Sequence, residues 1–234
     1  IGDIDYDGDL DILTFSAIGS HVEWHKNTSM DLFDSCDSLN YILEHNCWGN
    51  FTENFSDNSV TLNSCEQEKN ANKMKSGAHS GSTLTALDLN GDSYFELLLG
   101  DITFNNLVML ENSAPAENSI MISQDSQFPS YSQSVNLSRF PASFYFDFDN
   151  DNKKDLIIAP NGNNISHNYE NIWFYKNESS TNEVILNLSN RAALIDQMID
   201  VGSGAHPVFF DHNNDGLMDL IIANYGYYLD GGNF

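Results

Sequence analysis

Four short acidic segments of this 234-residue chain share one spacing of oxygen-bearing side chains. They begin at Asp3, Asp88, Asp147 and Asp211, and each has Asp or Asn at its first, third and fifth positions and a carboxylate at its ninth. Oxygen ligands on alternate residues of a tight loop converge on one point, and the backbone carbonyl of position seven joins them, as in the first nine positions of an EF-hand loop. The spacing therefore predicts a site for a hard divalent cation in each segment.

Calcium is the ion that this donor set favours. Magnesium demands a stricter octahedral geometry, and zinc prefers His or Cys, which these positions lack. We expect up to four calcium ions (Ca2+), each bound by the side chains of positions one, three, five and nine and by the carbonyl of position seven. The predicted ligands are Asp3, Asp5, Asp7, Asp9 and Asp11 in loop one; Asp88, Asn90, Asp92, Tyr94 and Glu96 in loop two; Asp147, Asp149, Asp151, Lys153 and Asp155 in loop three; and Asp211, Asn213, Asp215, Leu217 and Asp219 in loop four.

The residue at the sixth position indicates how well each loop fits the calcium-binding pattern. Gly8 and Gly216 hold it in loops one and four, which fit the pattern best. In loop three Asn152 is a mild change, because Asn tolerates a left-handed backbone. In loop two Ser93 must adopt that backbone with a Cβ, and Glu96 replaces the shorter acid at position nine, so loop two is the weakest predicted site.

The segments around the loops indicate strands rather than the helices of an EF-hand. Apolar segments at 83–87, 143–146 and 207–210 enter the last three loops, and short apolar runs follow all four. These runs are nearly continuous, which is typical of strands covered on both faces. Further strands ending in Asn are expected at 22–27, 107–112 and 172–177. The loop starts are 85, 59 and 64 residues apart, enough for a four-stranded antiparallel sheet in each unit.

The D-x-D-x-D-G-x-x-D loop, the L-I-I run and the Y-K-N strand together resemble the FG-GAP/VCBS repeat, which builds calcium-binding β-propellers. The resemblance covers most of the chain except roughly residues 30–75. It implies an all-β fold of four-stranded antiparallel blades, with a calcium loop between strands 1 and 2 of each blade, and a role outside the cell in adhesion or ligand binding. The units also resemble those of large secreted bacterial proteins exported by the type IX system.

We interpret residues 1–234 as part of one β-propeller domain with about three to four blades, and we expect the remaining blades in flanking sequence. Residues 30–75 form an irregular insertion in this interpretation. The insertion holds Cys36, Cys47 and Cys65, which allow at most one intrachain disulfide, and the pairing is left open. It is either a disulfide-pinned cap over a blade edge, which we favour, or the place of specific binding.

Composition excludes several kinds of partner. The chain has 34 acidic and 9 basic residues and a formal charge of −25, so it repels nucleic acid and anionic membrane surfaces. No apolar run approaches the roughly 20 residues of a membrane-spanning helix. Calcium modules that bind at about 10⁻⁴ to 10⁻³ M function where calcium is plentiful, which favours a secreted, extracellular or cell-surface location.

We expect a calcium-stabilised extracellular propeller that acts as a non-catalytic adhesion or binding scaffold. Its partners would be proteins or glycans. These partners could include other parts of the same long chain or a secretion or surface complex. No catalytic residue is assigned, because the chain lacks the motifs of serine hydrolases, zinc proteases and nucleotide-binding enzymes. The alternatives are a propeller-based enzyme acting on polysaccharide and a pure spacer module in a long secreted protein.

Overall fold

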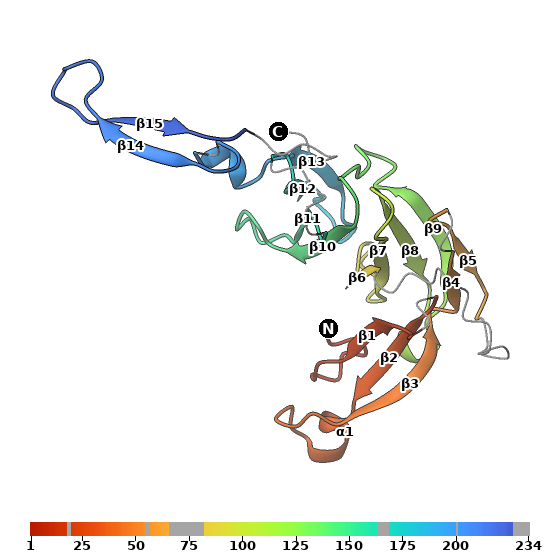
Figure 1. The fold of residues 1–234 in the computed structure, drawn as a ribbon. Coiled ribbons are helices and arrows are strands. Elements are labelled where there is room, and N and C mark those ends of the chain that lie inside the picture. Colours follow the sequence, from red (N-terminus) through yellow and green to blue (C-terminus); the bar gives the residue numbers. More distant parts are fainter. Residues whose placement is uncertain (18–19, 55–56, 66–81, 163–168, 200, 227–234) are drawn as a thin grey trace.

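The computed structural model describes residues 1–17, 20–54, 57–65, 82–162, 169–199 and 201–226 (Figure 1). Over these residues the chain is all-β, with antiparallel strands joined by tight loops and very little helix. The strands are β1 (Ile12–Phe15), β2 (Val22–Asn27), β3 (Tyr41–Trp48), β4 (Phe51–Glu53), β5 (Val60–Leu62), β6 (Thr83–Leu87), β7 (Glu96–Gly100), β8 (Leu107–Asn112), β9 (Met121–Phe128), β10 (Pro141–Phe146), β11 (Asp155–Pro160), β12 (Trp173–Asn177), β13 (Leu186–Asn190), β14 (His206–Phe210) and β15 (Asp219–Ala223). The helical elements are α1 (Ser29–Phe33), η1 (Ala116–Asn118) and η2 (Ile195–Gln197).

Two of the sheets are four-stranded antiparallel meanders, as the repeat spacing predicts. One has the order β6-β7-β8-β9 and the other the order β10-β11-β12-β13. In both, the expected entering strand is the first strand, the apolar run after the acidic loop is the second, and the strand that ends in Asn is the third. The sequence pattern thus places three strands of each unit correctly.

The first sheet has three described strands in the order β1-β2-β3, and β3 lies within residues 30–75, which the repeat pattern leaves as an irregular insertion. For the described part of residues 30–75 that interpretation needs correction, because β3 spans Tyr41–Trp48 and the hairpin β4-β5 follows it; residues 66–75 lie outside the described part. The strand escaped the pattern because α1 separates it from β2 and most of its side chains are at least partly exposed, so that no buried-exposed alternation marks it. In Figure 1 the β4-β5 hairpin lies beside β9, and the Gln124 side chain exchanges two hydrogen bonds with the Val60 backbone there.

The sheets that contain β1, β6 and β10 bury apolar side chains against their neighbours. On β7, Leu97 and Leu99 belong to the cluster shared with Trp24 of the first sheet, whereas Leu98 belongs to the cluster shared with Tyr175 of the third. All five residues of β7 are buried. The prediction of a strand covered on both faces is therefore confirmed for β7, and its cause is the packing of β7 between two neighbouring sheets.

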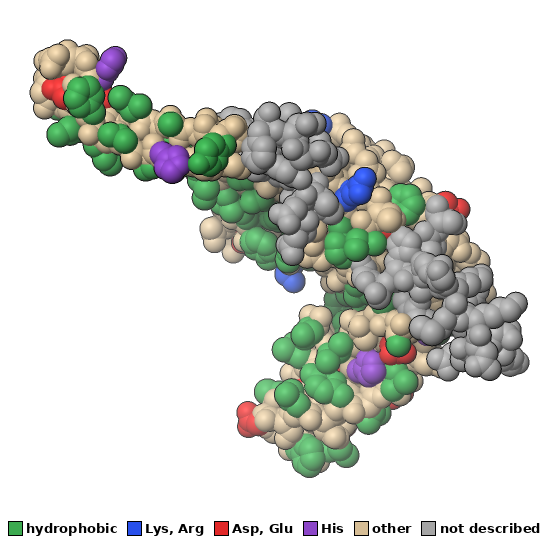
Figure 2. Space-filling model, in the orientation of Figure 1, with side chains coloured by type: hydrophobic (Ala, Val, Ile, Leu, Met, Phe, Trp, Pro, Cys, Tyr) green, Lys and Arg blue, Asp and Glu red, His purple; other side chains and the backbone are tan. Residues whose placement is uncertain are grey.

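The β14-β15 hairpin does not share this burial. Figure 2 shows hydrophobic side chains on its surface, and Leu220 and Ile221 remain 41% and 47% exposed. Two-sided coverage was expected for the run after loop four as well, and that expectation is wrong for the described residues. The reason is that none of the described sheets packs against either face of this hairpin.

The described sheets form an open, curved row rather than a closed ring (Figure 1). The β6-β9 and β10-β13 sheets touch through their first strands, where Thr85 Oγ1 on β6 donates to the Ser143 carbonyl on β10 at 2.8 Å. No helix among the described residues combines the length and apolar character needed to cross a membrane.

Candidate metal centre

Three of the acidic loops connect the first and second strands of a sheet. Loop two (residues 88–96) connects β6 to β7, loop three (147–155) connects β10 to β11, and loop four (211–219) connects β14 to β15. Loop one (3–11) precedes β1, and an isolated bridge between Gly2 and Asp11 closes its base. Loops two, three and four thus lie between the first and second strands of a sheet, where the sequence pattern places them.

One hydrogen-bond network recurs in all four loops. The first carboxylate accepts the N–H of position six at 3.0 to 3.2 Å, and the fifth carboxylate accepts the N–H of position seven at 2.7 to 3.1 Å. The bond from position five to the backbone N–H two residues on is that of an Asx turn, whereas the bond from position one spans the loop. They orient the carboxylates toward the inside of the loop. The accepting side chains are Asp3, Asp88, Asp147 and Asp211 at position one, and Asp7, Asp92, Asp151 and Asp215 at position five.

Two residues of each loop take a left-handed backbone. At position six this was expected, and Ser93 adopts it at φ 68° despite its Cβ. At position four it was not foreseen, although three of the four loops carry Gly or Asn there, residues that tolerate positive φ. The exception is Tyr6, at φ 60°, whose ring stacks on Phe95 of loop two at 5.3 Å. The φ values at position four are 60° for Tyr6, 79° for Gly91, 60° for Asn150 and 59° for Asn214.

The acid at position nine closes each loop. It accepts the N–H of position two at 2.7 to 3.2 Å in all four loops. In loops one and three its other oxygen accepts the backbone N–H of the Asn that ends β2 or β12, from Asn27 to Asp11 and from Asn177 to Asp155, both at 2.8 Å. Each oxygen keeps a second lone pair. In loops one and three position nine therefore ties the loop to β2 or β12 and can still contact a cation.

The strand-ending Asn residues also hold the turn that follows. Each side-chain Oδ1 accepts a backbone N–H from beyond the turn, which returns the chain toward the fourth strand. The sequence pattern shows these Asn residues but not their function as a link between the acidic loop and the next turn. The bonds are Asn40 N–H to Asn27 at 3.1 Å, Ile120 N–H to Asn112 at 3.1 Å, and Ile185 N–H to Asn177 at 3.4 Å.

Several carboxylates are buried at an electrostatic cost. Burial raises the pKa of Asp11 to about 6 and that of Glu96 to about 7, and in Glu96 the neighbouring Asp92 and Asp88 add to the rise. Burial also raises the pKa of Asp3 above its ordinary value. Without a cation these groups repel one another in a poorly solvated loop, so a bound cation would stabilise the ionised form of the loop.

Oxygen atoms without donors support a cation site. Asp3 Oδ1 and Asp9 Oδ1 in loop one and Glu96 Oε1 in loop two are buried and accept no hydrogen bond. Asp9 itself is 1% exposed. Buried polar atoms normally have a partner, so these oxygens are free to accept a cation. Because all the donors are oxygen atoms, the residues suit calcium.

Ligand atoms also converge in two of the loops. In loop one, carboxylate oxygens of Asp3, Asp5 and Asp11 lie within 4.8 Å of one another. In loop three those of Asp147, Asp149 and Asp151 do the same. In loops two and four the third position is Asn, and its amide donates to the fifth carboxylate instead, from Asn90 to Asp92 at 3.0 Å and from Asn213 to Asp215 at 2.9 Å.

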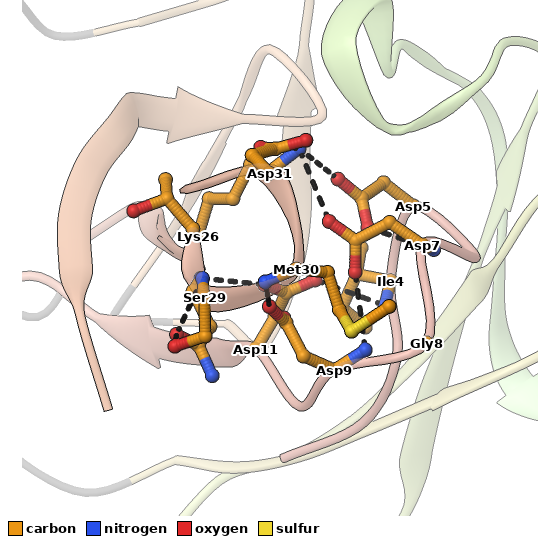
Figure 3. A network of polar contacts seen from close by, with 12 residues as sticks. Ile4, Asp5, Asp7, Gly8, Asp9, Asp11, Lys26, Ser29, Met30 and Asp31 are labelled. Carbon is orange, nitrogen blue, oxygen red and sulfur yellow. Dashed lines mark hydrogen bonds and ion pairs between the residues drawn. The ribbon is translucent and has the colours of Figure 1, made fainter. Parts of the chain in front are cut away.

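A lysine near the end of β2 reaches into loop one and a lysine near the end of β12 reaches into loop three, a feature that the spacing of the acids does not predict. Figure 3 shows Lys26 extended toward Asp5 and Asp7, with its Nζ 2.6 Å from Asp5 Oδ2 and 3.4 Å from Asp7 Oδ2. Lys176 contacts Asp149 and lies 2.9 Å from Asp151. The available signal was the K-N pair that ends both strands.

Loop one has an additional cover from the region after β2. The backbone N–H of Met30 in α1 donates to Asp9 Oδ2 at 3.0 Å, and Asp31 Oδ2 lies 3.0 Å from Lys26 Nζ (Figure 3). The Tyr41 hydroxyl donates to the Leu10 carbonyl at 2.9 Å. Asp9 was predicted to bind through its carbonyl, and the structure shows that its side chain also belongs to the polar network of this loop.

The cysteines form one disulfide, within the limit set by the sequence. Cys47 pairs with Cys65, and Cys36 is exposed with a free thiol. The disulfide joins the end of β3 to the segment after β5. It therefore pins the β4-β5 hairpin against the first sheet, a placement that fits the interpretation of this region as a cap.

Comparison with known families finds a match in the part of the chain that contains loops three and four. Residues 147–222 match the FG-GAP-like repeat family. The matched segment runs from the first Asp of loop three to the last but one residue of β15. No curated protein and no solved structure matches the chain.

Proposed function

We propose that this chain is a calcium-stabilised β-propeller segment of an extracellular or cell-surface protein, and that it serves as a non-catalytic scaffold for adhesion or binding. The observation that carries the proposal is the recurrence of one carboxylate network at the same structural position. In loops one and two this network leaves buried oxygens without donors. The FG-GAP-like repeat at residues 147–222 supports the same reading.

The cation would be held by the side chains of positions one, three and five, with position nine and the carbonyl of position seven completing the shell. Calcium supplies no redox chemistry here; its contribution is charge neutralisation within each loop. An ion that binds the folded loop and not the unfolded chain stabilises the fold by mass action, by about 2.7 kcal/mol at a hundredfold excess over Kd. Each loop connects the first two strands of a sheet or leads into one, so this stabilisation acts on the sheets themselves.

The scaffold part of the proposal rests on the surface that the sheets present. The meanders β6 to β9 and β10 to β13 are regular, whereas the segments inserted around β3 to β5 are particular to the first unit. Specific recognition is usually carried by such segments on a rigid framework. We therefore place the partner-binding surface, for a protein or a glycan, at α1 and the β4-β5 hairpin.

Calcium titration of chelator-treated protein tests the metal part. We expect binding in the range of extracellular modules, about 10⁻⁴ to 10⁻³ M, with weaker binding of magnesium, and a melting temperature that rises with calcium. Melting that is identical in calcium and in chelator, together with no heat of binding, would refute the metal assignment.

A glycan array and binding assays with defined surface proteins test the scaffold part, each run in calcium and in chelator. Calcium-dependent binding that is lost on replacing the β4-β5 hairpin with a short turn supports the scaffold. Turnover of a polysaccharide by the folded protein would favour the enzyme alternative instead. No binding to any glycan or surface protein would favour the spacer alternative.

A further inference from the structure

The two lysines that reach into the loops occupy the same place in their units. Lys26 directly precedes Asn27 at the end of β2, and Lys176 directly precedes Asn177 at the end of β12. Because the backbone N–H of each Asn is bound by the ninth-position acid, the preceding side chain is held at a constant place relative to the loop. The repetition of this arrangement in two independent units makes an accidental contact improbable.

The lysines accompany the loops with the most carboxylates. Loops one and three have an acid at all four side-chain positions, whereas loop two has Asn90 at its third position and so has three acids. At positions one, three, five and nine alone, four carboxylates and one ammonium leave three negative charges, the same number that loop two carries at these positions; Asp9 in loop one and Lys153 and Lys154 in loop three lie at other positions. The equivalent residue on β8 is Glu111, and its carboxylate accepts the Ser123 hydroxyl at 2.5 Å.

The ammonium groups lie on oxygens that a metal ion would use. Lys26 contacts the carboxylates of positions three and five of loop one, and Lys176 contacts those of positions three and five of loop three. Both side chains are partly shielded, with 17% and 32% exposure. A divalent ion on the same oxygens would meet a positive charge at close range, and both cannot stay in contact with the same oxygen pair.

We propose that Lys26 and Lys176 are tethered counterions that occupy the cation position of loops one and three in the calcium-free protein and must be displaced when calcium binds. This inference rests on the proposed function. It makes loops one to three unequal: loops one and three keep their shape at low calcium and bind it more weakly, whereas loop two depends on calcium itself. The ranking is the opposite of the one that the loop sequences alone suggest for loops one and two.

Calcium titration by isothermal calorimetry of Lys26→Met and Lys176→Met tests the inference. Methionine keeps much of the length of the side chain and removes the charge. We expect each variant to bind calcium at one site about tenfold more tightly than the unmodified protein, the order expected for removing a unit charge beside a divalent ion at a partly exposed site. In chelator each variant should melt at a lower temperature, because the carboxylates lose their counterion.

Lys154→Met is the matched control. Lys154 is also in loop three, and Lys154→Met makes the same change in net charge as Lys176→Met. The Lys154 Nζ, however, lies over the Tyr145 ring, 5.6 Å from its centre. Its calcium affinity should change much less than that of Lys176→Met. The reverse variant Glu111→Lys introduces an ammonium beside loop two and should weaken calcium binding there.

The outcomes separate the inference from the function on which it rests. If the unmodified protein binds no calcium, the proposed function fails and the inference with it. If it binds calcium but Lys26→Met and Lys176→Met match Lys154→Met in affinity and in chelator melting, only the inference is overturned. Tighter binding together with a lower melting temperature in chelator supports it, since loss of a merely structural contact would not tighten calcium binding.

Discussion

The acid at position nine of a loop accepts hydrogen bonds from the backbone and also lies beside the predicted cation site. Asp155 is fully buried and accepts the N–H groups of Phe148 and Asn177. Asp149, by contrast, is partly exposed and is held by the Lys176 ammonium. Removal of Asp155 therefore leaves backbone N–H groups without an acceptor, whereas removal of Asp149 leaves only one contact of the Lys176 ammonium unmade.

Asp155→Ala should destabilise the fold with or without calcium. It leaves two buried N–H groups without an acceptor, which costs about 2 to 4 kcal/mol. Asp149→Ala is the control, and its effect should appear mainly in calcium, because its partner is a partly exposed ammonium. Urea unfolding of both variants in chelator and in calcium measures this. Equal losses in chelator for the two variants would contradict the structural role of position nine.

Glu53 on β4 should make stability depend on pH. Burial raises its pKa to about 7 from 4.5, with Asp101 adding to the rise and the Ser82 hydroxyl opposing it. A carboxyl whose pKa is higher in the folded state binds its proton more tightly there than in the unfolded chain. Its contribution to stability is therefore complete below about pH 4.5 and is lost as the pH rises toward 7.

Glu53→Gln should remove that loss, because the amide stays neutral and keeps an oxygen for Ser82. We expect the variant to be more stable than the unmodified protein at pH 8, by about 1 to 3 kcal/mol, and similar to it at pH 4.5. Urea unfolding at the two pH values measures the difference. A gain of equal size at both values would show that titration of Glu53 is not its cause.

At the scale of elements, the close approach of β7 to β10 determines how the second and third sheets meet. A Cβ on Gly100 would lie 2.0 Å from the Pro141 carbonyl oxygen and 2.6 Å from Thr83 Oγ1. Thr83 Oγ1 donates to that same carbonyl at 2.7 Å. The missing side chain at Gly100 therefore permits the hydrogen bond between the sheets.

Gly100→Ala should push β10 away from β7 and destabilise the protein by about 1 to 3 kcal/mol or more, the usual cost of overpacking. Gly2→Ala is a suitable control, because its Cβ would meet only Ile4 at an ordinary 3.7 Å. Thermal unfolding of the two variants compares them. Equal melting temperatures would show that the two sheets adjust to the extra methyl group without cost.

At the scale of the whole molecule, a net charge of −25 works against the folded chain unless cations neutralise it. Much of the acidic charge is gathered in the four loops, where the carboxylates are a few ångströms apart. Sodium chloride screens this repulsion all over the surface, whereas calcium would neutralise the carboxylates of the loops directly.

Raising sodium chloride from 10 to 150 mM should therefore raise the melting temperature more in chelator than in saturating calcium. The Debye length falls from about 30 Å to about 8 Å over this range, so that distant carboxylates cease to repel one another. Scanning calorimetry in the two conditions measures the difference. A salt effect of the same size in calcium would show that the loops are not the source of the repulsion.

The spacing of acids and apolar runs by itself determined the all-β class, the loop positions and the first three strands of the two complete sheets. That information is local, because side-chain alternation and turn-forming residues act over a few positions. Tertiary structure alone decided what depends on distant segments: β3 and the β4-β5 hairpin in residues 30–75, the Cys47–Cys65 pairing, and the exposure of β14-β15. The same holds for the contacts of Lys26 and Lys176 with the acidic loops. Each lysine is far in the sequence from the loop carboxylates that it contacts, so the spacing of residues does not predict that they meet.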